Sequence, residues 1–193
     1  MIDHFRYVAG VYDRVMRPPD PERLKRILKL PVAGPILDLG GGTGRVSFRL
    51  RSLVGGAIVT DFSIPMLMQA AAKGGLLPVR AMGEALPFPD GIFDRVLIVD
   101  ALHHFRNQED AIMESLRVLK PGGRLAIEEP DIRRFVVRAV AFLEHLFLMR
   151  SRFHEPRRIM DMIEGQGFIP RIEGYHLFRV WIVADKRETS ETE

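Results

Sequence analysis

The sequence predicts one α/β domain with a doubly wound, mostly parallel sheet of seven strands and helices on both faces. Short apolar runs alternate with helical patterns between residues 36 and 129, and a glycine-rich turn follows the first of these runs. Such alternation is typical of βαβ units, whose right-handed crossovers build a parallel sheet. A length of 193 residues suits one such domain. We therefore expect residues 1–184 to form a single domain and residues 185–193 to form a flexible tail.

The predicted elements begin ahead of the glycine turn. Asp20 followed by Pro21 is typical of a helix N-cap and first turn, so a short helix is expected before the core. Residues 36–39 form a short buried strand, and helical spacing resumes near Gly44. A cap at Ser63 begins the next helix. Further strands are expected at residues 57–60, 77–81, 94–99 and 124–129, and a helix at residues 107–119.

The C-terminal third of the sequence has a different pattern of apolar residues. Residues 135–149 are strongly apolar, and Pro156 opens a helix that runs to about residue 166. Residues 168–184 contain an apolar run without the residues that typically begin or end a helix, and Gly174 marks a turn within them. We expect these residues to add an antiparallel hairpin of two strands to the sheet.

The composition excludes several kinds of chemistry. The chain has no cysteine, so it forms no disulfide or thiolate metal site and uses no cysteine nucleophile. Asp3, His4 and Arg6 interrupt the start of the chain, where a signal peptide would need an apolar run. No stretch reaches the roughly 18 to 20 apolar residues that span a bilayer. We expect a cytoplasmic protein with no transmembrane segment.

The positive charge is concentrated in one segment. The chain carries a formal charge of +3, yet residues 131–158 alone hold seven arginines against three carboxylates, a balance of +4. The rest of the chain is therefore at −1. Such a segment can mark an anionic partner, although arginines on solvated helix faces are the more common cause.

The glycine turn carries the strongest functional signal. Asp38 is followed by Gly40, Gly42 and Gly44, which let the backbone turn sharply and approach a ligand closely. In a doubly wound sheet, ligands bind beside the carboxyl end of the first strand, where this turn lies. A dinucleotide-binding turn needs glycine or alanine three residues after the second glycine, and Arg45 stands there. The spacing therefore disfavours a dinucleotide, and a plain tight turn is the simpler alternative.

Four motifs occur in the order of a known family. They are an acidic residue followed by x-G-x-G-x-G at residues 38–44, EALPFPDGIFD at 84–94, ALHHF at 101–105 and LRVLKPGG at 116–123. The sequence resembles class I S-adenosylmethionine-dependent methyltransferases of the type 11 group, which includes the C-methyltransferases of ubiquinone and menaquinone synthesis. The resemblance covers roughly residues 35 to 130. It implies a Rossmann-like fold, S-adenosylmethionine as cofactor and S-adenosylhomocysteine as product.

The resemblance also implies which residues hold the cofactor. Asp38 orders the methionine ammonium, usually through water, and the three glycines line the methionine and the ribose. Asp61 ends the second strand about twenty residues after the turn, where a carboxylate accepts hydrogen bonds from ribose hydroxyls. Capping the helix at Ser63 is the alternative role of Asp61. The predicted cofactor-binding residues are Tyr12, Asp38, Gly40, Gly42, Gly44, Asp61, Phe62, Met82 and Gly83.

One position departs from the family pattern. Family members often carry Gly-Asp-Ala before the Leu-Pro-Phe signature, and that aspartate contacts the adenine amino group. This sequence has Ala81, Met82 and Gly83 instead. We expect backbone groups and the Met82 side chain to contact the adenine, with plain core packing of Met82 as the alternative.

Two adjacent histidines are the candidate bases. Methyl transfer from a sulfonium needs alignment of the acceptor and exclusion of water, and a base helps where the acceptor carries a proton. His103 and His104 follow the fourth strand and can take a proton near neutral pH, so they are the candidate catalytic residues; packing against the next helix is the alternative. No metal site is expected, since adjacent side chains on an extended chain diverge. Glu129 and His154 are further pocket candidates.

Two segments are expected to cover the site. Residues 1–30 resemble the N-terminal lid of quinone C-methyltransferases, in which Tyr12 faces the sulfonium. Residues 131–158 lie where the family builds its substrate lid. Their apolar stretch flanked by arginines suits an amphiphilic or anionic acceptor, a dimer contact, a membrane-surface helix or a helix that covers the sheet edge.

The leading hypothesis is methyl transfer to carbon, oxygen or nitrogen of a small-molecule acceptor, aromatic or lipid-like, by a monomer or homodimer. An RNA or protein methyltransferase that uses the arginine-rich segment is the first alternative. The sequence shows no appended RNA-binding domain, no Asn/Asp-Pro-Pro-Tyr motif and no cysteine for cytosine-5 chemistry, which disfavours nucleic acid. A non-catalytic cofactor-binding protein is the second alternative, which the departure at Met82 favours.

Overall fold

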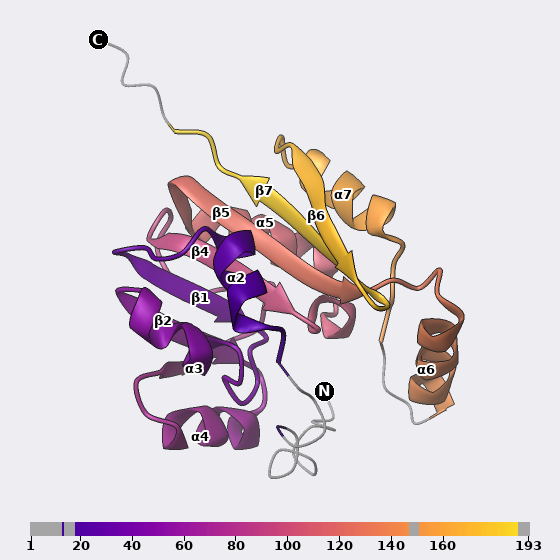
Figure 1. The fold of residues 1–193 in the computed structure, drawn as a ribbon, viewed down its shortest axis with the longest axis horizontal. Helices are drawn as coiled ribbons and strands as arrows, with labels where there is room; N and C mark the ends of the chain where they lie inside the picture. The colour runs from indigo at the N-terminus through magenta and orange to yellow at the C-terminus, as the bar shows by residue number, and fades with distance from the viewer. Residues whose placement is uncertain (1–12, 14–17, 147–150, 189–193) are drawn as a thin grey trace.

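The sheet has the architecture that the sequence predicts. The computed structural model describes residue 13, residues 18–146 and residues 151–188, with the backbone alone for residues 140 and 143–146. Its seven strands lie in the order β3-β2-β1-β4-β5-β7-β6 (Figure 1). β1 to β5 are parallel, whereas β7 is antiparallel to β5 and β6, which confirms the doubly wound sheet with an antiparallel hairpin. The predicted turn at Gly174 is wrong, because Gly174 pairs with Trp181 inside β6 and the chain turns at residues 177 and 178. The strands are β1 Pro35–Leu39, β2 Gly56–Asp61, β3 Leu77–Arg80, β4 Phe93–Val99, β5 Leu119–Pro130, β6 Pro170–His176 and β7 Arg179–Asp185.

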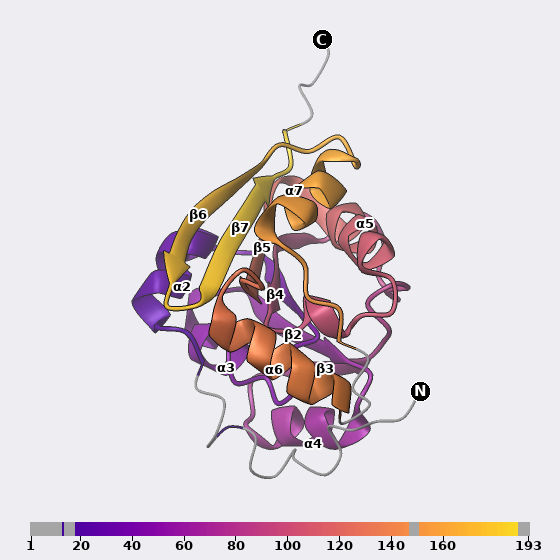
Figure 2. The same cartoon turned by 90° about the vertical axis from the view of Figure 1, so that its right-hand side faces the viewer.

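Helices cover both faces of the sheet. They are α2 Pro21–Leu28, α3 Ser47–Leu50, α4 Ile64–Ala72, α5 Gln108–Val118, α6 Phe135–Leu146 and α7 Pro156–Glu164, with 3-10 turns η2 Arg51–Leu53 and η3 Leu102–His104. α2, α3 and α4 bury Leu24, Leu50 and Leu67 in one cluster. α5 and α7 bury Ile112 and Ile159 in a second cluster. Figure 2 shows α2 and α3 on one side of the sheet and α5 and α7 on the other.

The central strand β1 is buried from both sides, and this explains its sequence. Ile36, Leu37 and Leu39 are each at most 1% exposed, as expected for a parallel strand with helices on both faces. Asp38 is also only 1% exposed, although an ionised carboxylate loses its hydration when it is buried. Such a group needs partners close by, and these partners lie at the carboxyl edge of the sheet.

The helix that follows the glycine turn begins later in the sequence than predicted. Helical spacing predicts a start near Gly44, but α3 begins only at Ser47. Gly40, Gly42 and Gly44 have φ angles of 69°, 57° and 69°, which belong to the left-handed region that a right-handed helix excludes. The turn therefore remains a loop at the carboxyl edge instead of joining the helix.

The two predicted helix caps have different outcomes. Asp20 caps α2 as expected, because its carboxylate accepts the backbone N–H of Arg23 at 2.9 Å. The predicted cap by Ser63 is wrong, since Ser63 occupies the N-cap position of α4 but its side chain makes no capping hydrogen bond. Asp61 accepts the backbone N–H of Ser63 at 2.8 Å instead. An ionised acceptor makes the stronger hydrogen bond, so the end of β2 fixes the start of α4.

α6 stands away from the body of the domain, outside the carboxyl edge of the sheet (Figure 1). The backbone N–H of Asp131, just before α6, donates to the carbonyl of Phe178 at 2.7 Å and so ties this segment to the turn between β6 and β7. No helix in the described ranges combines the length and the apolar character needed to span a bilayer.

Candidate active site

We call the glycine turn, residues 40–44, the cradle. Its three glycines with positive φ have different surroundings. A Cβ added to Gly40 would lie 2.8 Å from the Cβ of Ala101, and one added to Gly44 would lie 2.5 Å from a methyl of Leu76. A Cβ added to Gly42 would meet no atom closer than 3.8 Å, and that atom is a carboxylate oxygen of Asp61. An added Cβ at Gly40 or Gly44 would therefore clash, whereas one at Gly42 would make only ordinary contacts with Asp61 and Met66.

The carboxylate of Asp38 lies directly under this cradle. A Cβ on Gly41 would be 2.6 Å from the carboxyl carbon of Asp38, and the hydroxyl of Ser47 donates to that carboxylate at 2.5 Å. Burial raises the pKa of Asp38 to about 6, against the opposing effects of the Ser47 hydrogen bond and the charge of Arg45. The side chain therefore changes charge close to neutral pH.

Asp61, at the end of β2, joins the cradle to α4. One of its carboxylate oxygens accepts the N–H of Gly42 at 3.0 Å, and the other accepts the N–H of Ser63 at 2.8 Å. The alternative role of Asp61, at the start of α4, is therefore present in the structure, and its ribose role stays a prediction.

The loop after β3 lies beside Asp61, because the backbone N–H of Ala81 donates to the carbonyl of Asp61 at 3.2 Å. Met82 is 39% exposed, so the alternative that it is plain core packing is wrong. The ring of Phe105 lies between two predicted cofactor segments, because Cβ atoms added to Gly83 and to Gly40 would meet it at 3.3 Å and 3.1 Å. The sequence did not single out Phe105. Phe62, also predicted to bind the cofactor, lies under the guanidinium of Arg80, whose carbon is 5.0 Å from the ring centroid.

Asp13 contacts the glycine turn and the C-cap residue of α4. Tyr12, the predicted lid residue, lies outside the described residues. Its neighbour Asp13 accepts a hydrogen bond from the hydroxyl of Thr43 and pairs with the ammonium of Lys73 at 2.7 Å. Lys73 also donates to the carbonyl of Thr43 at 2.8 Å. These contacts place residue 13 beside the turn.

His103 and Glu129 form a buried pair at the ends of β4 and β5. The Nδ1 of His103 lies 2.6 Å from one carboxylate oxygen of Glu129, and the two side chains are each 4% exposed. The other oxygen accepts the backbone N–H groups of Ala101 and Leu102 at 3.1 Å and 2.8 Å. With Glu129 as acceptor, Nδ1 carries the proton and Nε2 is the basic atom. The ring of Phe153 stacks on His103 at 4.2 Å.

His104 has a different environment from its neighbour. Its Nδ1 lies 3.1 Å from the hydroxyl of Ser151. Burial, and then the charge of His103, holds the pKa of His104 well below its usual value, so this ring is neutral at physiological pH. The expectation that the two side chains diverge is wrong, because η3 is a helical turn and the ring centroids lie 4.0 Å apart. Among the described residues, no group of three or more potential ligands could hold a metal ion.

A buried network of charges, which sequence reasoning missed, lies beside the cradle. Asp100 directly follows β4, has a φ of 57° and lies 3.9 Å from Arg45 and 3.1 Å from Arg179. Arg179 also pairs with Glu128 at 3.1 Å. Burial raises the pKa of Glu128, while the adjacent Arg179 opposes that rise. A left-handed φ at a non-glycine residue stores strain, which is typical of functional sites.

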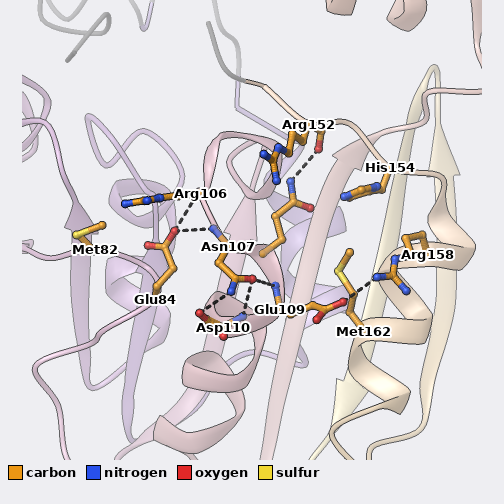
Figure 3. Close-up of a pocket in the computed structure, with 11 residues that line it drawn as sticks. Met82, Glu84, Arg106, Asn107, Glu109, Asp110, Arg152, His154, Arg158 and Met162 are labelled. Carbon is orange, nitrogen blue, oxygen red and sulfur yellow. Dashed lines mark hydrogen bonds and ion pairs between the residues drawn. The ribbon is translucent and has the colours of Figure 1, made fainter. Parts of the chain in front are cut away.

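A cavity of about 780 Å³ borders the site on the side of α5 and α7. Figure 3 shows Met82 and Arg106 on one side of it and His154 and Arg158 on the other. Burial, followed by the charges of Arg158 and Arg152, lowers the pKa of His154. Arg152, which lines this cavity, is hydrogen-bonded to η3, because its backbone N–H donates to the carbonyl of His103 at 2.7 Å.

These features fit S-adenosylmethionine, which presents an ammonium, a sulfonium and two ribose hydroxyls. Asp38 and Asp61 supply carboxylates, and the backbone of Gly42 lies beside Asp61 with no side chain between them. The turn lies at the carboxyl end of β1, where a doubly wound sheet binds nucleosides. The fold and the site therefore define an enzyme class, the Rossmann-like proteins that bind a nucleoside cofactor carrying a positive charge.

Comparison with known proteins identifies the family. The family described as "Methyltransferase domain" matches residues 37–127. The ubiquinone/menaquinone biosynthesis C-methyltransferase UbiE of Edwardsiella ictaluri is 35% identical over 180 residues, which cover 84% of this chain and 69% of that protein. UbiE proteins of Erwinia tasmaniensis and Stutzerimonas stutzeri are 35% and 39% identical over 52% and 41% of their own length. The chain thus spans about half the length or less of those two relatives.

A solved structure shares the whole fold. A methyltransferase of Thermotoga maritima, described as S-adenosylmethionine-dependent and possibly a histamine N-methyltransferase, superimposes with a TM-score of 0.77 at 24% identity. The match covers 95% of this chain and 98% of that one. The chain belongs to the class I S-adenosylmethionine-dependent methyltransferases, in the type 11 group.

Proposed function

We propose that the acceptor is a small hydroxylated aromatic compound of the hydroquinone type and that the methyl group goes to a ring carbon. The relatives that carry this proposal are C-methyltransferases of ubiquinone and menaquinone biosynthesis. The buried pair of His103 and Glu129 supports it, because carbon methylation of such a ring is helped by removal of a hydroxyl proton. A cytoplasmic location, a monomeric or dimeric state and a substrate lid at residues 131–158 are further parts of the proposal.

The cofactor supplies an electrophilic methyl group on a sulfonium. In the proposed complex, Asp38 faces the ammonium and Asp61 accepts from the ribose hydroxyls. The glycine turn, Gly83 and Phe62 enclose the nucleoside, and Met82 packs against the adenine. Tyr12 belongs to this proposed set as a lid residue.

The proposed reaction needs one base. His103 takes the acceptor's hydroxyl proton at Nε2, and Glu129 stabilises the imidazolium that forms. Removal of this proton would make the ring carbon nucleophilic enough to accept the methyl group. The hydrogen of that carbon would then leave as a proton to solvent, and the imidazolium of His103 would return its proton to the ring oxygen, which restores the aromatic ring. Of the two histidines, His103 suits this role better, since the lowered pKa of His104 makes it the weaker base.

A pair of glycine variants tests the cofactor site. We expect Gly42→Ala to lower the affinity for S-adenosylhomocysteine roughly tenfold, because the added methyl would intrude into the space beside Asp61. Gly74→Ala is the matched control, since Gly74 has a φ of 71° and nothing within 4 Å of an added Cβ. Titration calorimetry measures both variants. Equal affinities of the two variants would contradict the proposed location, and an absence of binding by the natural protein would contradict the cofactor.

Asp38 makes cofactor binding depend on pH. Burial raises the pKa of Asp38 to about 6, and a bound ammonium favours its ionised form, so binding releases a proton. We expect the affinity to rise with pH through this value, and to be roughly tenfold lower at pH 5 than at pH 7. The α-ammonium stays charged throughout this range, because such groups titrate near pH 8. Calorimetry in buffers of different ionisation enthalpy measures the released proton. Asp38→Asn should abolish the release, and a pH-independent affinity in the natural protein would refute the coupling.

A further inference from the structure

The outer face of α6 is apolar although it points away from the domain. Phe135, Val136 and Phe142 are 84%, 58% and 64% exposed, whereas Val137 is 2% exposed. At 3.6 residues per turn, Phe135 and Phe142 project within about 20° of each other and Val137 projects from the opposite side. The helix therefore binds the domain through one face and presents two phenylalanines on the other.

Arginines border this apolar face. Arg134 and Arg138 are exposed and precede and follow Phe135 along the helix. Neither makes an ion pair with any residue that the structure describes, whereas Arg133 pairs with Asp131 at 2.7 Å. The face thus combines apolar area with two arginines that form no ion pair within the described part of the chain.

The turn between β6 and β7 extends the same surface. Leu177 is 76% exposed at this turn, and the hydrogen bond from Asp131 to Phe178 holds the turn beside the start of α6. The hydroxyl of Tyr175 accepts from Arg133 at 3.4 Å and adds a second link. We call Phe135, Val136, Phe142 and Leu177, with Arg134 and Arg138, the α6 face.

We propose that the α6 face binds to the surface of an anionic lipid bilayer. An exposed helix with phenylalanines beside arginines is typical of helices that lie in the membrane interface, where anionic headgroups neutralise the arginines. A second copy of this chain on the same face would bring together like charges and bury them unpaired, which opposes association. Because α6 stands outside the carboxyl edge of the sheet (Figure 1), the bilayer would lie on the same side as the glycine turn.

Vesicle co-sedimentation of the full chain tests this proposal. We expect binding to vesicles of phosphatidylcholine mixed with phosphatidylglycerol, little binding to pure phosphatidylcholine, and release by high salt. Phe135→Ser/Phe142→Ser and Arg134→Gln/Arg138→Gln should each lower the partition coefficient roughly tenfold or more. The measurement needs neither the acceptor nor methyl transfer, so its failure and the failure of the proposed reaction are distinguishable.

Matched controls carry the same chemical changes elsewhere on the surface. Met68→Ser/Met113→Ser removes two apolar side chains that are 64% and 45% exposed, and Arg26→Gln/Arg49→Gln removes two exposed arginines on α2 and α3. Both control variants should bind vesicles like the natural protein, and all four variants should retain S-adenosylhomocysteine binding. The proposal would be overturned if the natural protein did not bind anionic vesicles, or if the control variants lost as much vesicle binding as the α6 variants. It would also be overturned if the protein formed a dimer that only Phe135→Ser/Phe142→Ser dissociates.

Discussion

Replacing Asp61 by alanine is expected to lower the affinity for S-adenosylmethionine and S-adenosylhomocysteine roughly hundredfold or more. Each hydrogen bond to a charged group contributes about 1.5 to 3 kcal/mol, and a ribose offers two hydroxyls to this carboxylate. The change also removes the acceptor of the Gly42 and Ser63 N–H groups, which loosens the cradle at its center. Titration calorimetry with each ligand measures the loss.

The matched control for Asp61→Ala is Asp20→Ala. Asp20 is also a carboxylate that accepts a backbone N–H at the start of a helix, but it lies at α2 on the surface. Loss of a cap costs about 1 kcal/mol of stability, so both variants should show a modestly reduced melting temperature. Only Asp61→Ala should lose cofactor affinity. If both variants bind equally well, Asp61 acts only as a cap.

His103→Ala is expected to lower kcat about a hundredfold or more with the affinity for S-adenosylhomocysteine unchanged, because a positioned base contributes at this scale. Glu129→Gln should lower kcat too. An amide offers one oxygen to the three donors that now share the carboxylate, so it cannot both hold the backbone of η3 and orient His103. Transfer of a radioactive methyl group to naphthohydroquinone measures the rate.

Two observations separate a base from a structural residue. The space left by the ring of His103, beside Phe153, suits a free imidazole, which should restore part of the activity of His103→Ala. His104→Asn is the control, and its activity should stay close to that of the natural protein because the lowered pKa of His104 makes it a poor base. A larger loss in His104→Asn than in His103→Ala would reverse the assignment. Full activity of His103→Ala would show that alignment of the acceptor alone suffices.

The strands and the cradle could be predicted because their signals are local. A buried parallel strand is a continuous apolar run, and a left-handed turn selects glycine at fixed spacing. The start of α3 was misplaced because helical spacing continues through Gly44, whereas the φ of 69° at this residue excludes a helix. The spacing of apolar residues predicts that a helix is present more reliably than it predicts the residue at which the helix begins.

The charges beside the cradle could not be predicted, because their partners are distant in the chain. Arg179 and Asp100 are 79 residues apart, and Arg179 and Glu128 are 51 residues apart. The pairing of β5 with both of its neighbours, β4 and the antiparallel β7, brings them together. The distinction between His103 and His104 has the same origin, since it depends on Glu129 and Ser151 from other segments.

The network of Arg45, Asp100, Glu128 and Arg179 also constrains how this sequence can diverge. It holds two positive and two negative side chains in a largely buried place, so the loss of any one leaves an opposite charge without compensation. Breaking a buried ion pair costs about 3 to 5 kcal/mol, which is a large part of the stability of a domain. In an alignment of relatives, these four positions should therefore covary. Relatives that keep the glycine turn should also keep the C-terminal hairpin.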